Sequence, residues 1–354
     1  INPATIVAEL DTILAQNRAE LLLLLSEIIS LDWNFIQKLD DLDDRLQHFW
    51  SPINHLHAVK QTAKLRLAYN ECLAKISAYS SELSQNSRLY QAIKTLDNGD
   101  YRFNYAQKKC LHNELRDFHL GGIDLPKAKQ KRYQVIQAQL AQLSNQFEEN
   151  LLDATANWSK CISDKSELKG LPTYIIASAE KAAKDKNMSG CLLSLDYPCY
   201  FPVLSYADNR ALRESVYKAY ITRASEFGNM AFDNSPIMFK ILNLRHELSQ
   251  LLGFKNYAQK SLASNKMAKT PEEVLSFLEN LLRCTQSKAD AEWQALYNFA
   301  QSRDQIDTLQ PWDILYYREK LQEKMFGICD DTLRCYFPVE KVLSGLFKLI
   351  HDLF

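Results

Sequence analysis

The chain contains FPVLSYADNRALRESVYKAYITRAS at residues 201–225, followed after a short loop by SPIMFKILNLRHELSQLLGF at 235–254. In the second stretch the apolar residues recur three or four positions apart and share one side of a helix: Ile237, Ile241, Leu244, Leu248 and Leu251. This pattern predicts an amphipathic helix with a buried apolar seam. Segments with the same periodicity fill most of the chain, so the sequence predicts a mostly α fold.

The same helix carries His246, Glu247 and Gln250, one residue type short of the zinc-protease motif H-E-x-x-H. In that motif two histidines one turn apart bind zinc, and the glutamate activates water. Here Gln250 offers an amide where zinc requires an imidazole, and His246 points about 180° away from the apolar seam. The motif is either a degraded zinc site or a surface histidine, and ligand identity favours the surface histidine. We predict no metal ligand and no catalytic residue in this chain.

Composition limits the class of protein. The chain has 354 residues with 42 basic and 43 acidic side chains and a net charge of −1, which gives no bulk electrostatic reason to bind nucleic acid or an anionic membrane. Eight scattered cysteines, Cys329 among them, include no C-x-x-C pair and indicate reduced thiols in a cytoplasmic protein. The longest apolar run, Leu21 to Leu25, is too short to span a bilayer.

Helix start and stop signals predict a large multi-helix assembly with long helical hairpins. Helices are expected after Asn2-Pro3, from near Asp32 to before Pro52, over 64–81, 87–96, 105–120 and 126–161, after Leu171-Pro172, over 235–254, 271–303 and 311–325, and after Pro338. In the 126–161 segment apolar residues recur about every 3.5 positions. That spacing fits either the seam of a coiled-coil dimer or an intramolecular hairpin, and the neighbouring amphipathic helices favour the hairpin.

The segment CLLSLDYPCYFPVLSYADN, residues 191–209, is the one stretch with strand character, because it is rich in aromatic and branched residues and contains two prolines. We expect a small β element near 191–206, as a hairpin or as edge strands. No repeat or low-complexity linker divides the chain. We place a domain boundary between an amino-terminal helical region with the long hairpin, 1–190, and a second helical region, 191–354.

Other common motifs for phosphate binding and for nucleophilic catalysis are absent from the sequence. No G-x-G-x-x-G, G-x-x-x-x-G-K or G-x-S-x-G pattern occurs, which excludes the common phosphate loops and the hydrolase nucleophile elbow. His55 and His57 diverge on a helix, so we interpret them as structural histidines and not as metal ligands.

Several strings of residues carry a resemblance to a known family. They are SPINHLHAVK (51–60), ELRDFHLGGIDLPKAKQKRY (114–133), FPVLSYADNRALRESVYKAYITRAS (201–225), DNSPIMFKILNLRHELSQLLGFKNYAQKSLASNKMAKTPEEVLSFL (233–278), LQPWDILYYREKLQE (309–323) and LRCYFPVEKVLSGLF (333–347). Together they resemble the thimet oligopeptidase family of zinc metallopeptidases, in order and over nearly the whole chain.

The resemblance implies a mostly helical, two-domain peptidase around a deep channel that admits short unstructured peptides. In that family zinc lies on an H-E-x-x-H helix with a third glutamate ligand, in the carboxyl-terminal half. His246 and Glu247 match a helix that the family places before its zinc motif. The resemblance therefore implies that this chain is the amino-terminal portion of a cytoplasmic, monomeric, zinc-dependent metalloendopeptidase. It would supply scaffold and channel wall, bind no zinc itself, and be inactive without the absent carboxyl-terminal catalytic half.

Which residues touch peptide is unknown from the sequence. Polar and aromatic residues cluster at Tyr206, Arg213, Tyr217 and Arg223, which makes them candidates, but core packing and helix pairing explain them equally well. The alternative function is a non-catalytic helical peptide-binding or scaffold protein that lost the catalytic half. Under the leading hypothesis, the chain should expose an apolar face where the absent half packs.

Overall fold

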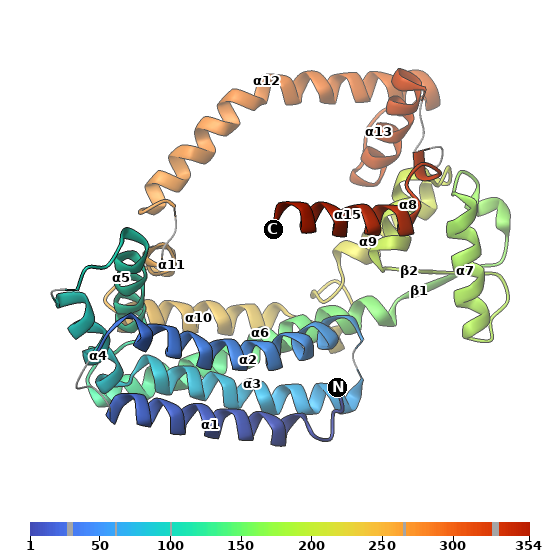
Figure 1. Cartoon of the computed structure of the whole chain (residues 1–354). Coiled ribbons are helices and arrows are strands. Elements are labelled where there is room, and N and C mark those ends of the chain that lie inside the picture. Colours follow the sequence, from blue (N-terminus) through green and yellow to red (C-terminus); the bar gives the residue numbers. More distant parts are fainter. Residues whose placement is uncertain (27–30, 61, 100, 265–266, 328–332) are drawn as a thin grey trace. The chain divides into compact units, whose positions relative to one another are not determined.

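The computed structural model describes residues 1–26, 31–60, 62–99, 101–264, 267–327 and 333–354 (Figure 1). Its helices include α1 (Ile6–Ser26), α2 (Trp33–Val59), α3 (Ala63–Ser84), α4 (Ser87–Asn98), α5 (Tyr105–Leu120), α6 (Lys127–Asn157), α7 (Thr173–Asp185), α8 (Tyr197–Tyr206), α9 (Arg210–Ile221), α10 (Ser235–Leu251), α11 (Tyr257–Ala263), α12 (Pro271–Asp304), α13 (Pro311–Phe326) and α15 (Val339–Leu353). The strands β1 (Ser159–Ile162) and β2 (Cys191–Ser194) form a small antiparallel sheet. The predicted mostly α fold is confirmed.

Residue contacts divide the chain into two compact units. The first comprises Ile1–Glu148 together with Pro236–Phe277, and the second comprises Glu149–Ser235 together with Leu278–Phe354. The domain boundary expected between residues 190 and 191 stays a prediction, because a compact unit of contacting residues is not by itself an independently folding domain.

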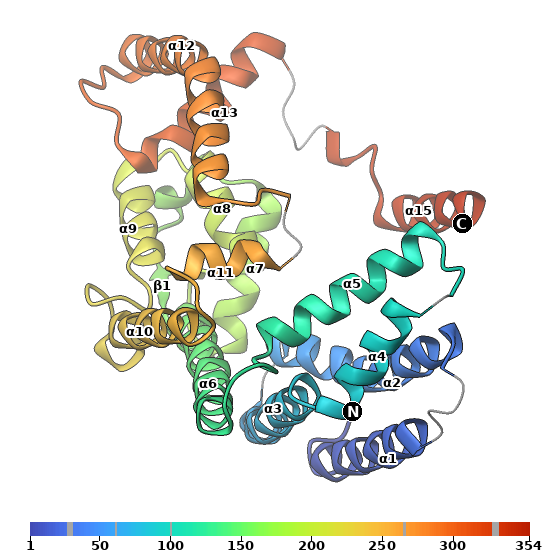
Figure 2. The same cartoon turned by 90° about the vertical axis from the view of Figure 1, so that its left-hand side faces the viewer.

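Local side-chain bonds fix the helix ends in the first unit. Asn104 opens α5 through a capping box with Gln107, and the backbone N–H of Gly121 closes it on the carbonyl of Asp117. The helices α1, α2 and α3 lie side by side (Figure 1), and α4 packs against α5 (Figure 2). The apolar faces of the first three helices form one core: Ile6, Leu10, Leu14, Leu46, Ile53, Leu65, Tyr69, Cys72 and Tyr79.

The helix α2 continues through Pro52 to Val59, so its predicted end before this proline is wrong. A proline removes one backbone hydrogen bond. Ile53 and His57, within the next two turns, are both buried, and we attribute the continued helix to their packing. The His57 ring stacks on Tyr69 at a centroid distance of 3.8 Å, which agrees with its interpretation as a structural histidine.

The long helix α6 packs within the chain, as the hairpin interpretation expects. Its residues Tyr133 and Ile136 form an apolar cluster with Leu248 of α10 in the first unit. The helix ends at Asn157, and Cys161 lies in β1, so the predicted extension to residue 161 is wrong. Cys161, which extended the apolar period, is exposed, and its neighbour Ile162 is the buried residue of β1, because successive residues of a strand face opposite sides.

In the second unit, β1 and β2 pack with α7, α8 and α9 around an apolar core that includes Leu193, Val203 and Val216. The β element near 191–206 exists, but only Cys191–Ser194 is a strand, and its partner is Ser159–Ile162, not a neighbouring hairpin arm. Residues 197–206 form α8 instead. Its first proline stands in the first turn, where no backbone N–H is needed, and burial of Val203 and Leu204 stabilises the rest.

No helix in the described part of the chain is both long enough and apolar enough to cross a membrane. Six of the described cysteines are free thiols: Cys72, Cys110, Cys161, Cys191, Cys199 and Cys284. Cys329 lies outside the described residues.

Candidate functional site

The near-zinc motif on α10 is engaged in a structural ion pair. The guanidinium of Arg132, on α6, donates from Nε to Glu247 Oε1 and from Nη2 to Oε2, each at 2.6 Å. This bidentate bond lowers the pKa of Glu247 below its ordinary value. His246 is exposed, as the helical period predicts. The glutamate therefore ties α10 to α6 within the first unit.

Gln250 also has a structural role. Its side-chain Nε2 donates to the carbonyl of Phe254 at 3.3 Å and to that of Lys255 at 3.0 Å. The turn between them contains Gly253 at φ 81°, a conformation that favours glycine. An amide that donates to two carbonyls closes the end of the helix and does not present a metal ligand.

This donor set does not fit zinc. Gln250 supplies an amide in place of the second imidazole, and Arg132 holds both oxygens of Glu247, the residue that would activate water in the motif. Across the described ranges, no three histidine, cysteine, aspartate or glutamate side chains converge in a way that could hold a metal ion.

Of the four candidate peptide contacts, Arg213 is the most deeply placed, with 1% of its surface exposed. Its Nη1 donates to the carbonyl of Ala207 at 2.7 Å, and its Nη2 donates to Asp313 Oδ1 at 3.0 Å. The guanidinium also lies 4.1 Å from the ring centroid of Tyr316. These bonds join α9 to α13, so Arg213 holds the second unit together and is closed to a peptide.

The other three candidates also make contacts within the second unit. Tyr217 lies one turn after Arg213, and its ring is 6.0 Å from that of Trp312. The Arg223 guanidinium lies 3.4 Å from the Tyr220 ring centroid and donates to the Tyr220 carbonyl. Tyr206 packs against the apolar core. The structure thus brings Arg213 and Tyr217 together against α13. This arrangement agrees with the alternative that helix pairing, and not peptide binding, explains these residues.

Asp313 is the residue that the sequence did not point to. It is fully buried, and Arg210 donates to it from Nη2 at 2.6 Å in addition to the bond from Arg213. Burial alone would raise its pKa, but the hydrogen bonds from Arg210, the Gln310 backbone and Arg213 outweigh burial and lower the pKa below its ordinary value. The partners lie about 100 residues apart, so no local pattern reveals the pair.

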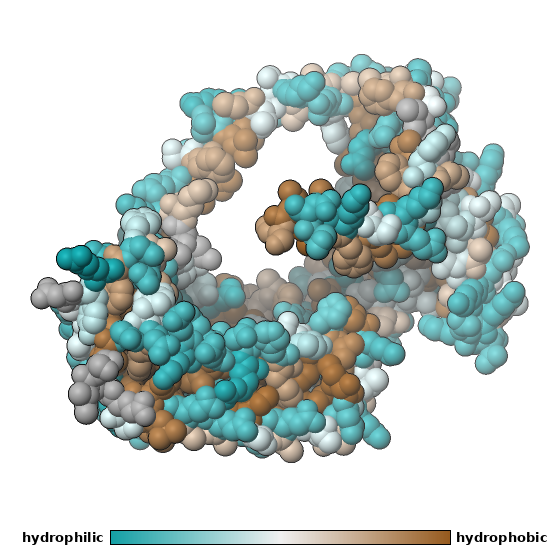
Figure 3. Space-filling view, in the orientation of Figure 1, coloured by the Kyte–Doolittle hydropathy of each residue, from teal (hydrophilic) through white to brown (hydrophobic). Residues whose placement is uncertain are grey.

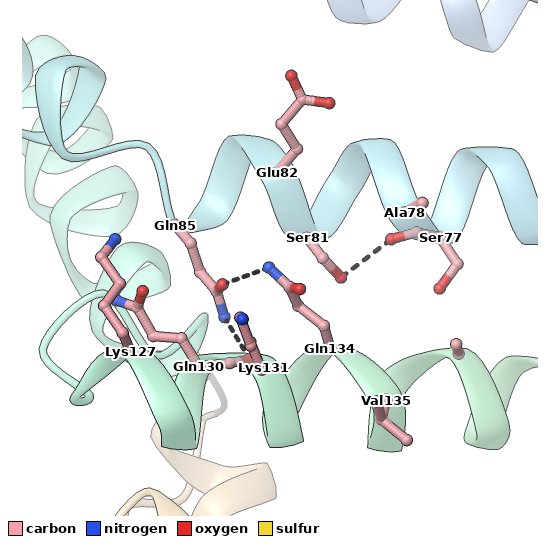
Figure 4. Close-up of a pocket in the computed structure, with 11 residues that line it drawn as sticks. Ser77, Ala78, Ser81, Glu82, Gln85, Lys127, Gln130, Lys131, Gln134 and Val135 are labelled. Carbon is pink, nitrogen blue, oxygen red and sulfur yellow. Dashed lines mark hydrogen bonds between the residues drawn. The ribbon is translucent and has the colours of Figure 1, made fainter.

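A groove of about 620 Å³ lies between α3 and α6 in the first unit (Figure 4). Gln134 Nε2 donates to Gln85 Oε1 at 2.7 Å across it. Lys127 and Lys131 stand on the α6 side, while Glu82 on the α3 side pairs with Arg18 at 2.8 Å. Amides, lysines and serines can hold polar groups, but Ser81 donates to the carbonyl of Ser77, and Glu82 is paired with Arg18, so the two do not form a nucleophile and base pair.

Comparison with known proteins gives two family matches. A family model described as Neurolysin/Thimet oligopeptidase, N-terminal domain matches residues 10–130, and one described as Peptidase family M3 matches residues 203–354.

Individual relatives agree with these matches. The chain is 45% identical over 359 residues to Oligopeptidase A of Salmonella typhimurium, covering 100% of the chain and 53% of the relative. It is 46% identical over 325 residues to Oligopeptidase A of Escherichia coli, covering 91% of the chain and 48% of the relative. For the Probable cytosolic oligopeptidase A of Arabidopsis thaliana the identity is 36% over 342 residues, covering 93% and 48%. The chain thus spans about half the length of the curated relatives it matches.

The two family models and the named relatives all belong to a class of peptidases. The chain belongs to the thimet oligopeptidase family, peptidase family M3.

Proposed function

We propose that this chain is the amino-terminal portion of a zinc-dependent endopeptidase that hydrolyses short oligopeptides in the cytoplasm and acts as a monomer. The observation that carries the proposal is the 45% identity to Oligopeptidase A along 100% of the chain. The Arabidopsis thaliana relative whose name includes "cytosolic" supports the location.

In this proposal the chain supplies scaffold and channel wall, and zinc is bound elsewhere in the protein. The support is chemical: Gln250 supplies an amide at the position of the second zinc-binding histidine, and Arg132 holds Glu247, the residue that would activate water. Zinc, when bound in the protein, would polarise the scissile carbonyl and activate water. The chain alone is then inactive.

The proposal includes a partner surface on α12 and α15. No residue of α15 is buried, although it is strongly amphipathic. Its exposed apolar residues are Val339, Val342, Leu343, Leu346, Phe347, Leu349, Ile350 and Leu353. Figure 3 shows brown, apolar atoms of this helix open to solvent. In the part of α12 that belongs to the same unit, Leu278, Leu281 and Leu282 are exposed as well. Since such faces mark interaction sites, we assign them to contact with the region that the relatives have and this chain lacks.

The test is hydrolysis of a quenched fluorescent peptide by the 354-residue chain and by a longer protein that joins it to the second half of the Escherichia coli relative. Each is assayed with added zinc and with a chelator. We expect chelator-sensitive turnover from the longer protein only.

Two results would count against the proposal. Chelator-sensitive turnover by the chain alone would refute its predicted inactivity. If the longer protein folds, binds zinc and cleaves no peptide, the chain's role in a peptidase fails, and the non-catalytic scaffold alternative is favoured.

A further inference from the structure

A second cavity in the first unit, of about 600 Å³, lies on the other side of the gap between α3 and α6. Its walls come from α3, the end of α5, α6, α10 and α11, and its lining includes Arg245, Tyr257, Lys260, Tyr133, Asp117 and Leu140. A cavity of this volume suits a small molecule or a few residues of a peptide. It is separate from the near-zinc motif, since Glu247 and Gln250 do not line it.

Two cations of this cavity lack a close carboxylate partner. The Arg245 guanidinium lies 4.9 Å and the Lys260 Nζ 6.0 Å from the centroid of the same ring, that of Tyr257. Within the described residues, neither donates a hydrogen bond or forms an ion pair at contact distance. Both side chains are half-buried. Burial lowers the pKa of Lys260, and the charge of Asp117 opposes that shift.

Asp117, the one carboxylate among the described residues that line this cavity, is already engaged. Asp117 acts on Lys260 through space, but its two oxygens accept hydrogen bonds from Arg116 at 2.9 Å each. The positive charge of Arg116 offsets the negative charge of Asp117. The cavity therefore keeps the positive charge of Arg245 and Lys260.

A buried donor adds to these cations. Tyr133 is 5% exposed, and its hydroxyl accepts a hydrogen bond from Gln137 Nε2 at 2.7 Å, which leaves the hydroxyl hydrogen to donate. Leu140 and the Tyr257 ring supply apolar surface beside the polar groups. A guanidinium, an ammonium and a phenol hydroxyl around an apolar wall match an organic anion.

We propose that this cavity is a binding site for a carboxylate group of an organic ligand. The planar fork of the Arg245 guanidinium matches the two oxygens of a carboxylate. The carboxylate can be the terminal group of a peptide or an acidic side chain. The site needs no zinc and no residue outside the chain, so it is independent of the proposed peptidase activity.

The test is calorimetric titration of the 354-residue chain with three peptides: N-acetyl-Gly-Phe, N-acetyl-Gly-Phe amide and N-acetyl-Glu-Phe amide. At least one carboxylate form should bind about tenfold more tightly than the Gly-Phe amide. Tighter binding of N-acetyl-Gly-Phe identifies a terminal carboxylate, and tighter binding of the Glu-Phe amide identifies a side chain. Equal affinity of all three peptides, or no binding at millimolar concentration, overturns the proposal.

Variants locate the site. Lys260→Gln and Arg245→Gln should each weaken binding of the preferred peptide about tenfold, while Lys260→Arg should retain most of it. The matched control is Lys131→Gln, an exposed lysine of the groove in Figure 4, which should leave the affinity unchanged. Thermal unfolding of each variant checks that it folds. Unchanged affinity in a folded Lys260→Gln variant contradicts the proposal.

Discussion

Replacement of Asp313 by asparagine removes the negative charge between Arg210 and Arg213 while keeping the shape of the side chain. Arg213 is 1% exposed and cannot recover hydration, so its charge is left buried without a counter-ion. Arg210 is 43% exposed on its side chain and can turn toward water. Loss of one partner of a buried pair costs about 3–5 kcal/mol. We assign most of this cost to Arg213.

The assay is urea unfolding followed by circular dichroism and by tryptophan fluorescence. Trp312 adjoins the site, and coincident transitions by the two probes test whether unfolding is two-state. The matched control is Asp307→Asn, an exposed carboxylate before α13, which should change the free energy of unfolding by less than about 0.5 kcal/mol. Arg210→Gln should lower the free energy of unfolding by about 1–2 kcal/mol, since Asp313 remains paired with Arg213 in that variant. If Asp313→Asn costs no more than the control, the buried pair does not hold α9 to α13 as we argue.

Three further predictions concern other contacts. Glu247→Gln should cost at most about 1 kcal/mol in chemical unfolding, because both partners are about 40% exposed; a loss above about 3 kcal/mol would contradict the geometry. Since the folded pKa values of Asp313 and Glu247 lie below their ordinary values, the stability they contribute is present above the unfolded pKa. It is lost as pH falls through the folded pKa, and an acid titration of Asp313→Asn should be flatter than that of the parent chain. Leu248→Ala should cost about 2–4 kcal/mol and Leu242→Ala, at an exposed position of the same helix, less than about 1 kcal/mol; equal losses in thermal or urea unfolding would refute the assigned face.

Much of the helical layout follows from local signals. The expected starts at Pro271 and Pro311 and the stop at Gly121 agree with the structure, because proline and glycine act through the backbone of their own turn. The errors at Pro52 and in residues 197–206 have another cause. There, burial of residues such as Ile53 and Val203 against distant segments outweighs the local cost of proline, and the sequence around each proline contains no trace of those partners.

The site shows the same division between local and distant information. The helical period alone predicts that His246 lies away from the apolar seam, and the exposed histidine agrees. Glu247 is held in an ion pair by Arg132, which lies 115 residues earlier in the chain. Arg213 is buried against Asp313, which lies 100 residues later. A charged residue next to a motif-like string therefore has two possible meanings, reactive group or structural tie, and only its distant partner distinguishes them. In this chain Arg132 pairs with Glu247, and Asp313 pairs with Arg213. Both ion pairs join two helices, so both charged residues are structural ties.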